Sequence, residues 1–311
     1  MKSNRRDFLK SASILAASGL IAGKTSIAGA REIASPKAVK NFGLQIYSLG
    51  REFMTDVPGG LKKVAEMGYA TIELAGVRDG KAYGMELKEF RKAAEDVGLK
   101  ITSSHVNPPV NEYKADNRAQ ITEYWKKTVA DHVTLGCKYL IQPGLPQTRS
   151  VEEVKYVCEV FNEAGQISKA AGVQWGYHNH DFEYAYVTEG GTQAIFGRRG
   201  VPRGAKTIYD LFLENTDPAL VVFENDVYWT VMGQHDPLEY ILGHKDRIRL
   251  LHIKDKEVLG QSGMMNFENI FKAAYSTGIQ DFFVELEGFS GGQFVGVKGC
   301  ADYLLNAPFV K

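Results

Sequence analysis

The sequence predicts an α/β protein with one (β/α)8 TIM barrel behind a short N-terminal export segment. From residue 41 onward, short runs rich in Val, Ile, Phe and Tyr alternate eight times with longer helical patterns. Several helical patterns stop at a glycine just before the next apolar run, where glycine ends a helix in the left-handed conformation. Eight such units fit one closed barrel of roughly 250 residues. A doubly wound open sheet is the structural alternative, but no GxGxxG motif follows the first apolar run.

Each element of the barrel is predicted by its residue range. Strands are expected at 42–48, 71–75, 100–106, 138–143, 173–179, 220–226, 248–254 and 281–287. Helices are expected at 59–67, 86–97, 117–135, 151–171, 237–243, 267–276 and 298–305. The helix-ending glycines are Gly68, Gly98, Gly136, Gly172 and Gly278. Residues 181–206 form a connection of about 25 residues, longer than usual for a barrel. It is either a lid over the barrel mouth or a solvated loop or subunit contact.

Composition narrows the classes of function. The 311 residues include 37 basic and 37 acidic side chains, so the formal net charge is zero. A balanced charge gives no electrostatic reason to expect nucleic acid or an anionic membrane as a partner. The three cysteines form no CxxC or Cys/His spacing, so neither a zinc knuckle nor a disulfide framework is indicated.

The first thirty residues are predicted to be an export signal. Arg5-Arg6 precedes Phe8-Leu9-Lys10, which resembles a twin-arginine signal. The apolar run from Ala12 to Gly23 is too short to span a bilayer, and Ala28-Gly29-Ala30 is a small-x-small cleavage site. We therefore expect a periplasmic protein in which residues 1–30 are removed, residues 31–40 form a linker and residues 41–311 form the barrel. No stable membrane anchor is expected after cleavage.

Polar residues stand at the carboxyl end of every predicted strand, where TIM barrels carry their active sites. In chain order they are Gln45 and Tyr47, Glu73, His105, Gln142, His178 and His180, Glu224 and Asp226, His252 and Lys254, and Glu285 and Glu287. Successive strand residues alternate faces, so the two members of each pair share a face. Eight unrelated surface strands would not all place polar groups at the same end. We therefore expect these side chains to converge on one mouth.

Four of these residues, from four consecutive strands, are predicted to bind one divalent metal ion: His178, Asp226, His252 and Glu285. Adjacent barrel strands lie about 4.8 Å apart, so their tips can surround one ion. Nitrogen and carboxylate ligands together suit Mn, Co, Zn, Mg or Fe. Of Glu285 and Glu287, the deeper residue is assigned to the metal. Glu183 lies beyond its strand and ranks below His178 as a ligand.

The remaining polar residues are assigned to chemistry and to substrate binding. Glu73, Lys254 and Glu287 are candidates for acid–base roles. The candidates for substrate binding are Gln45, Tyr47, His105, Gln142, His180, Trp229 and Arg203. Arg203 belongs to the long connection, which also holds Arg198 and Arg199, and such arginines can bind a carboxylate or a phosphate.

At these residues the sequence resembles the xylose-isomerase-like TIM-barrel family, whose members are commonly labelled sugar phosphate isomerases/epimerases. The resemblance covers essentially all of residues 41–308, and the matching stretches are Leu44–Leu49, Gly68–Leu74, Tyr177–Glu183, Asp226–Trp229 and Leu251–Asp255. It implies metal ligands on strands five to eight, namely Glu, Asp, His and Glu. The last three match Asp226, His252 and Glu285, whereas His178 stands where many members have Glu. Ketose 3-epimerases use the missing carboxylate as a second base, so the resemblance favours one-sided proton abstraction.

The expected function is that of a metal-dependent carbohydrate isomerase, epimerase or lyase that removes a proton next to a metal-bound sugar carbonyl. A periplasmic lyase or hydratase of 3-keto-glycosides is an alternative that the resemblance also implies. Export favours free sugars, glycosides or their oxidised forms over phosphorylated sugars. A non-catalytic sugar-binding barrel and an endonuclease-IV-like phosphodiesterase are alternatives from other classes. The expected partner is a small carbohydrate rather than nucleic acid, and a homo-oligomer remains open.

Overall fold

The computed structural model describes residues 40–197 and 199–311, so the predicted export signal lies outside the described part. Eight parallel strands form the predicted TIM barrel, and each lies within its predicted range. They are β1 (Gly43–Gln45), β2 (Thr71–Leu74), β6 (Lys100–Ser104), β7 (Tyr139–Gln142), β8 (Gln174–His178), β11 (Val221–Asp226), β12 (Ile248–Ile253) and β13 (Asp281–Val284). The predicted fold class is therefore confirmed.

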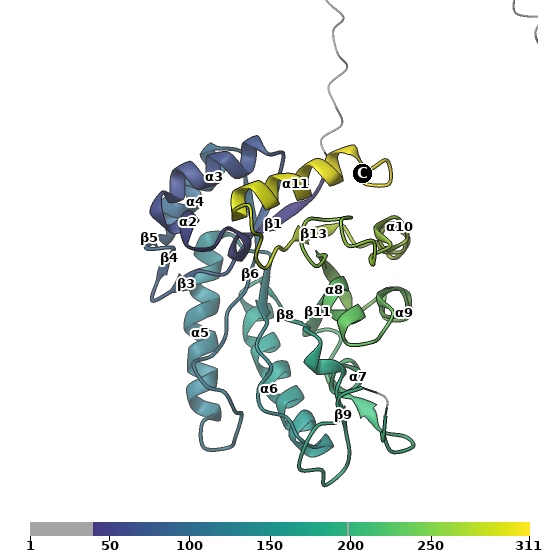
Figure 1. The fold of residues 1–311 in the computed structure, drawn as a ribbon. Helices are drawn as coiled ribbons and strands as arrows, with labels where there is room; N and C mark the ends of the chain where they lie inside the picture. Colours follow the sequence, from purple (N-terminus) through teal and green to yellow (C-terminus); the bar gives the residue numbers. More distant parts are fainter. Residues whose placement is uncertain (1–39, 198) are drawn as a thin grey trace, which may run out of the picture. The chain divides into compact units, whose positions relative to one another are not determined.

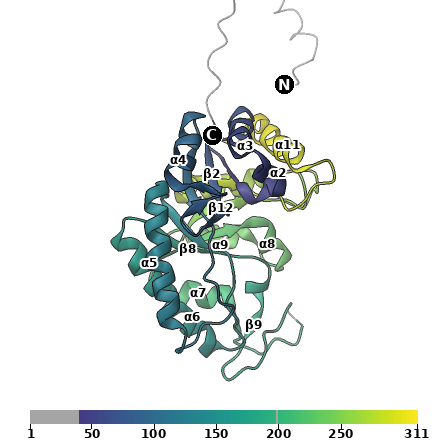
Figure 2. The ribbon, with the colours of Figure 1, turned by 90° about the vertical axis from the view of Figure 1, so that its left-hand side faces the viewer.

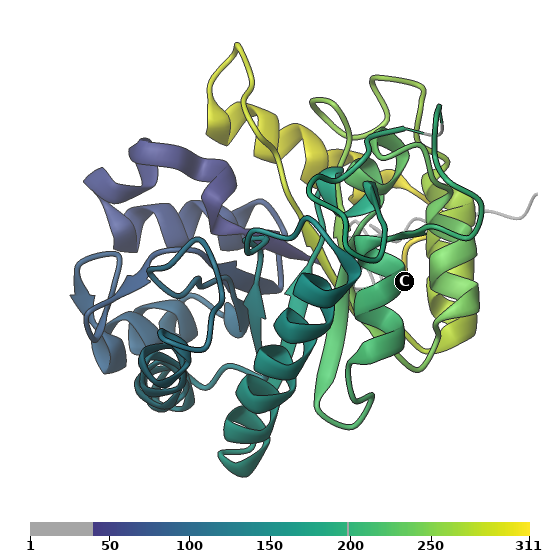
Figure 3. The same ribbon diagram turned by 90° about the horizontal axis from the view of Figure 1, so that it is seen from below.

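The strands follow one another around the barrel in chain order. The hydrogen-bonded order is β6-β2-β1-β13-β12-β11-β8-β7, which leaves β6 and β7 as the closing pair. The closing contact is a parallel bridge between His105 and Ile141, beside a 2.9 Å hydrogen bond from the Lys138 amide to the Thr102 carbonyl. In Figure 3 the helices surround the strands in the same order, from purple through teal and green to yellow.

All seven predicted helices are present. They are α3 (Val57–Glu66), α4 (Leu87–Asp96), α5 (Arg118–Leu135), α6 (Val151–Ala170), α9 (Pro237–Gly243), α10 (Phe267–Thr277) and α11 (Gln293–Asn306); each is labelled in Figure 1. The predicted helix-ending glycines all have positive φ, and Gly136 and Gly278 are left-handed C-caps. Within the described residues, no helix combines the length and the apolar character that crossing a bilayer requires.

Several short elements on the connections were not predicted. They are η1 (Ile46–Leu49), α2 (Gly50–Thr55), η2 (Phe182–Tyr184), α7 (Ile208–Asn215), α8 (Val227–Met232) and a small antiparallel sheet of β3 (Val77–Arg78), β4 (Lys81–Ala82) and β5 (Met85–Glu86). The long connection after β8 is closed at its base by β9 (Tyr186–Val187) paired with β10 (Lys206–Thr207). Figure 2 shows this excursion beside α6 and α7.

The barrel interior is filled in layers. Tyr139, Ile141, Val222, Leu250 and Phe283 form an apolar cluster inside the barrel. Gly43 makes room for it, because a Cβ there would lie 2.6 Å from the Phe283 ring. The next inward positions toward the carboxyl ends of the strands are polar and buried, and they form the floor of the site.

Candidate metal and substrate site at the barrel mouth

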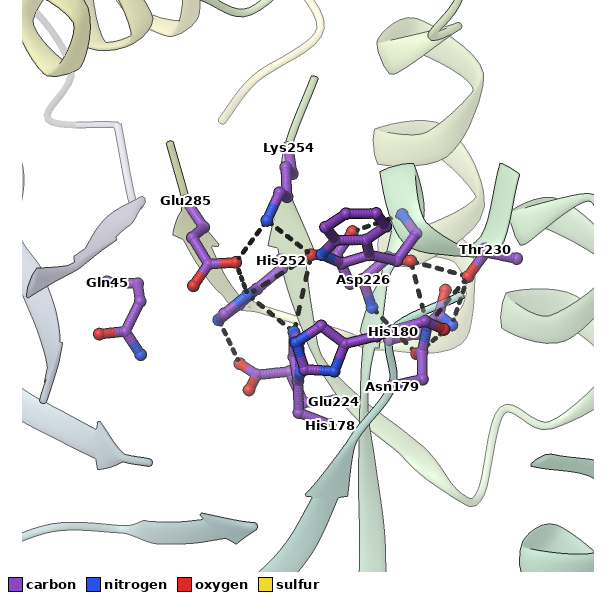
Figure 4. A network of polar contacts seen from close by, with 12 residues as sticks. Gln45, His178, Asn179, His180, Glu224, Asp226, Thr230, His252, Lys254 and Glu285 are labelled. Carbon is purple, nitrogen blue, oxygen red and sulfur yellow. Dashed lines mark hydrogen bonds and ion pairs between the residues drawn. The ribbon is translucent and has the colours of Figure 1, made fainter. Parts of the chain in front are cut away.

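The four predicted metal ligands lie together. His178, Asp226, His252 and Glu285 each offer a ligand atom within 4.8 Å of the others, and all four residues are buried. His178 Nε2 lies 3.0 Å from His252 Nδ1 and 3.6 Å from Asp226 Oδ2. Glu285 Oε2 lies 3.3 Å from His252 Nδ1. Figure 4 shows these side chains converging from separate strands.

Local structure leaves one oxygen of Asp226 free to face the cluster. Asp226 ends β11 and is the N-cap of α8, where its Oδ1 accepts a 2.9 Å hydrogen bond from the Trp229 amide. The Asp226 amide donates to Asn179 Oδ1 at 3.1 Å. The second oxygen, Oδ2, is buried and has no hydrogen-bond partner within the described residues. A buried carboxylate oxygen without a donor is costly, and a bound cation would compensate it.

The donor set fits a divalent transition metal. Two imidazole nitrogens and two carboxylates suit Zn, Mn, Co or Fe, and metal binding requires neutral histidine and ionised carboxylates. Burial, with His252 next to it, lowers the pKa of His178 well below its ordinary value. Burial alone would raise the pKa of Glu285, but His252 and Lys254 hold it well below its ordinary value. Both groups are therefore in the protonation state that binds a cation.

The other side of the His252 ring is held by a carboxylate. His252 Nε2 lies 2.6 Å from Glu73 Oε2, which also accepts a 2.8 Å hydrogen bond from Gln45 Nε2. A metal on Nδ1 leaves the proton on Nε2, and a carboxylate that accepts this proton fixes the ring and strengthens the ligand. Glu73 is fully buried and lines none of the cavities at the mouth. The structure therefore gives Glu73 an orienting position instead of the predicted acid–base contact with substrate.

Replacing Glu73 with Gln is expected to weaken metal binding about 10- to 100-fold, the usual effect of losing such an orienting carboxylate. Competition with a fluorescent chelator measures the affinity. Glu268→Gln is the matched control, because Glu268 is exposed on α10 and forms an ion pair with Lys272, away from the metal group. Equal affinities for the three proteins would contradict the orienting role.

A second group of metal-capable side chains lies beside the first. Glu73, His105, Glu224 and His252 also offer ligand atoms within 4.8 Å of one another. His105 Nε2 lies 2.7 Å from Glu224 Oε2, and burial together with Glu73 raises the pKa of Glu224. This group uses Nε2 of His252, whereas the first uses Nδ1. Ions at both places would need a fully deprotonated imidazole, so we assign the metal to the first group. Glu224 had no predicted role, although its position two residues before Asp226 places both on one face.

A cavity of about 490 Å³ opens above the first group. Its wall includes Glu285 and Glu287 and four of the predicted substrate-binding residues, namely Tyr47, His105, His180 and Trp229. Tyr47 was predicted inside the first strand, but its side chain is 62% exposed. The strand ends at Gln45, whose Oε1 accepts a 3.0 Å hydrogen bond from the Tyr47 amide and turns the chain into η1.

Lys254 lies buried between the metal group and the cavity. Its Nζ lies 2.9 Å from Glu285 Oε2, donates to Glu287 Oε1 and sits 4.8 Å from the centre of the Trp229 ring. Burial would lower the pKa of Lys254, but Glu285, Asp226 and Glu287 raise it above its ordinary value. Lys254 is therefore an ammonium ion at neutral pH, which suits charge stabilisation and proton donation but not the role of a base.

His180 is a neutral polar group of the cavity wall. Burial lowers its pKa to about 4, and its Nδ1 is buried with no hydrogen-bond partner in the described chain. Its ring stacks on Phe182, with ring centres 4.9 Å apart. Because the residue lines the cavity, its ring can make the predicted contact with a substrate hydroxyl.

Three predicted binding residues do not line this cavity. Both polar ends of Gln45 are engaged by Glu73 and the Tyr47 amide. Gln142 departs from its predicted inward face, because Ile141 fills the interior at that level; its side chain bonds Tyr113 and the Gly144 carbonyl, each at 2.8 Å. Arg203 is exposed on the connection between β9 and β10.

Glu183, which ranked below His178 as a ligand, is turned away from the metal group. It accepts hydrogen bonds from the Tyr177 hydroxyl and, at 2.8 Å, from the His180 amide. Burial raises the pKa of Glu183 to about 8. These contacts hold the chain at the end of β8, where His178 and His180 are presented.

Comparison with known proteins agrees with this geometry. The family model described as "Xylose isomerase-like TIM barrel" matches residues 61–299. The chain belongs to this family. The resemblance seen in the sequence is thereby confirmed, and so is the likeness to enzymes labelled sugar phosphate isomerase/epimerase. Two crystal structures with that name from Parabacteroides distasonis ATCC 8503 are similar to the chain. One is 51% identical (TM-score 0.81; 88% of this chain and 100% of that one), and the other is 44% identical (TM-score 0.83; 90% and 100%).

More distant relatives extend the comparison. An inosose dehydratase from Geobacillus kaustophilus (strain HTA426) is 23% identical over 212 residues, which cover 63% of this chain and 60% of that protein. The chain thus matches about three-fifths of the length of this relative. The IOLI protein, whose crystal structure has a bound zinc atom, is 16% identical (TM-score 0.62; 84% of this chain and 95% of that one) and shares the fold.

Proposed function

We propose that the chain is a metal-dependent enzyme of carbohydrate metabolism, a lyase or isomerase that removes the proton next to a sugar carbonyl. One observation carries the proposal. Glu285, one of the four residues of the metal group, lines a sugar-sized cavity whose wall also holds Glu287. One metal ligand and one carboxylate base thus line the same substrate space, and both contact the buried ammonium of Lys254.

The four residues of the metal group would hold one divalent ion, which supplies a positive charge that polarises the carbonyl. Glu287 then takes the proton from the adjacent carbon, because it lines the cavity and 36% of its side chain is exposed. The buried ammonium of Lys254, which contacts both carboxylates of the cavity wall, stabilises from behind that wall the negative charge that develops on the substrate oxygen. His180 contacts a hydroxyl of the sugar, and Trp229 offers an apolar face to the sugar ring; together they orient the substrate.

The placement of the carboxylates favours chemistry on one face of the sugar. Among the described residues that line the cavity, the carboxylates are Glu285 and Glu287, and both follow β13. On the opposite side β8 presents His178 and His180, which are neutral. Epimerisation through two carboxylate bases needs one on each face. Elimination of water or of a leaving group, or a one-base isomerisation, needs only one.

The names of the relatives support this reaction class, and the N-terminal sequence supports a substrate without phosphate. The relatives carry the names sugar phosphate isomerase/epimerase and inosose dehydratase, and a dehydratase removes a proton from one face. Arg5-Arg6 and the apolar run after them favour export to the periplasm. The proposed substrates are therefore free keto-sugars, inososes and 3-keto-glycosides.

Isotope exchange in D₂O tests the proposal. Protein beginning at Arg31 is loaded with Mn²⁺, Co²⁺ or Zn²⁺ and incubated with a panel of keto-sugars, inososes and 3-keto-glycosides, with and without chelator. We expect deuterium uptake or elimination at the carbon next to the carbonyl, and we expect chelator to abolish it. Metal binding without exchange across the panel would contradict the reaction. Sugar binding that survives chelation, with no exchange, would instead indicate a binding protein.

A further inference from the structure

A second, larger cavity adjoins the one above the metal group. It has a volume of about 970 Å³ and runs between η1 and α2 on one side and the β3–β5 sheet on the other. The two cavities share the wall residues Tyr47, Ala75 and Glu287, so they lie side by side at the barrel mouth. Pockets of roughly 300–1,000 Å³ hold small ligands, so the first cavity suffices for one sugar ring. The second cavity, called the side groove below, is therefore space for another part of the ligand.

The wall of the side groove combines apolar surface with positive charge. Tyr47 and Met54 are 62% and 53% exposed, a large exposure for side chains of this kind. Arg51 and Arg78 also line it, and neither forms an ion pair within the described chain. Of the other charged groups, Lys81 pairs with Glu86 and Glu287 pairs with Lys254. The negative charge of Asp79 offsets that of one arginine, so the wall of the side groove carries one net positive charge.

The floor of the side groove is held in place by specific contacts of Tyr83. Tyr83 has a φ of 50°, a left-handed conformation that is unfavourable for a bulky residue. Its hydroxyl accepts a 2.8 Å hydrogen bond from the Ala75 amide, and its ring packs edge-on against Phe53. These contacts fix the β3–β5 sheet to the end of β2 and hold the groove open beside the metal group.

We propose that the side groove binds the second half of a two-part substrate, an aglycone with a ring and an acidic group. The apolar ring would lie against Tyr47 and Met54, and the acidic group would meet Arg51 and Arg78, since guanidinium groups bind carboxylates through paired charge-assisted hydrogen bonds. The inference rests on the proposed function only in that the sugar ring occupies the cavity above the metal group. It makes the substrate a glycoside of an acidic ring compound rather than a free sugar.

Binding measurements test the side groove without relying on turnover. The probes are glucose, phenyl β-D-glucoside and 4-carboxyphenyl β-D-glucoside, titrated calorimetrically into the metal-loaded protein at low salt. We expect the carboxylated glycoside to bind about tenfold more tightly than the phenyl glycoside. The double variant R51Q/R78Q should abolish this preference and leave the affinity for the phenyl glycoside unchanged. R249Q is the matched control, because Arg249 is exposed near the opposite end of β12.

The outcomes separate this inference from the proposed function. Equal binding of the two glycosides, no binding of either, or a preference that persists in R51Q/R78Q would overturn the inference. Chelator-sensitive isotope exchange with a free keto-sugar would then leave the proposed reaction intact. A preference that depends on the two arginines, in a protein without isotope exchange, would support the side groove and count against the reaction.

Discussion

Replacing Asp226 with Asn is expected to remove the bound metal and to reduce isotope exchange to the background rate. The Asn side chain can still accept the hydrogen bond from the Trp229 amide, so α8 keeps its cap. The second oxygen becomes an NH₂ group, which cannot ligate a cation and which faces His178 Nε2, now 3.6 Å from Asp226 Oδ2. We expect metal affinity to fall by more than about 100-fold, beyond the usual effect of a residue that only orients a ligand.

Metal content per chain after dialysis, measured by mass spectrometry, is the primary readout. Thermal unfolding of the metal-free proteins shows whether the fold is retained. Asp236→Asn is the matched control, because Asp236 is also an N-cap, of α9, and accepts a 2.9 Å hydrogen bond from the Leu238 amide far from the metal group. A D226N protein with full metal content and normal exchange would contradict both the assigned site and the mechanism.

The barrel and the metal group could be predicted from sequence because both depend on local periodicity. Buried parallel strands produce short apolar runs, and the glycine before each run marks the end of the preceding helix. Period-two alternation then places Glu224 with Asp226 and His252 with Lys254 on one face, whatever the rest of the fold does. The four residues of the metal group were found together in space for this reason.

The parts that sequence did not reveal depend on tertiary packing. Gln142 faces away from the interior because Tyr139 and Ile141 fill the barrel at that level, and no local pattern distinguishes the two faces of a fully buried strand. Tyr47 leaves the strand because the Gln45 side chain caps a turn there. The helix α7 was missed because five of its eight residues are buried, which erases the helical period.

The orienting role of Glu73 was also hidden, because it depends on a contact across the barrel. Glu73 and His252 are 179 positions apart in the chain, yet their side-chain atoms lie 2.6 Å apart. From sequence, a carboxylate at a strand end is equally suited to bind metal, to transfer a proton or to hold a ligand in place. The distance to His252 Nε2, together with the absence of Glu73 from the cavity wall, favours the third role.

Replacing Glu287 with Gln is expected to lower turnover about 10²- to 10⁴-fold while metal binding remains normal, the effect of removing a general base. Glu287 lies outside the metal group and contacts Lys254, and its carboxylate reaches the cavity that holds the substrate. The amide is nearly the same size but cannot accept the proton. The effect should appear in kcat, because the contacts that bind substrate are nearly unchanged.

Comparing Glu287→Gln with Asp226→Asn distinguishes a residue that binds the metal from a residue that transfers the proton. Glu257→Gln is the control for Glu287→Gln, because Glu257 is exposed on the connection after β12. Rates of deuterium uptake and metal content are measured on the same preparations.

If Glu287→Gln loses metal, the carboxylate of Glu287 belongs to the ligand set, and the deeper Glu285 does not complete that set alone. If it keeps both metal and exchange, the proton is taken by another group. The neutral His180, whose ring lines the same cavity, would then be the base, and the sugar would react from the β8 side of the barrel instead of the β13 side.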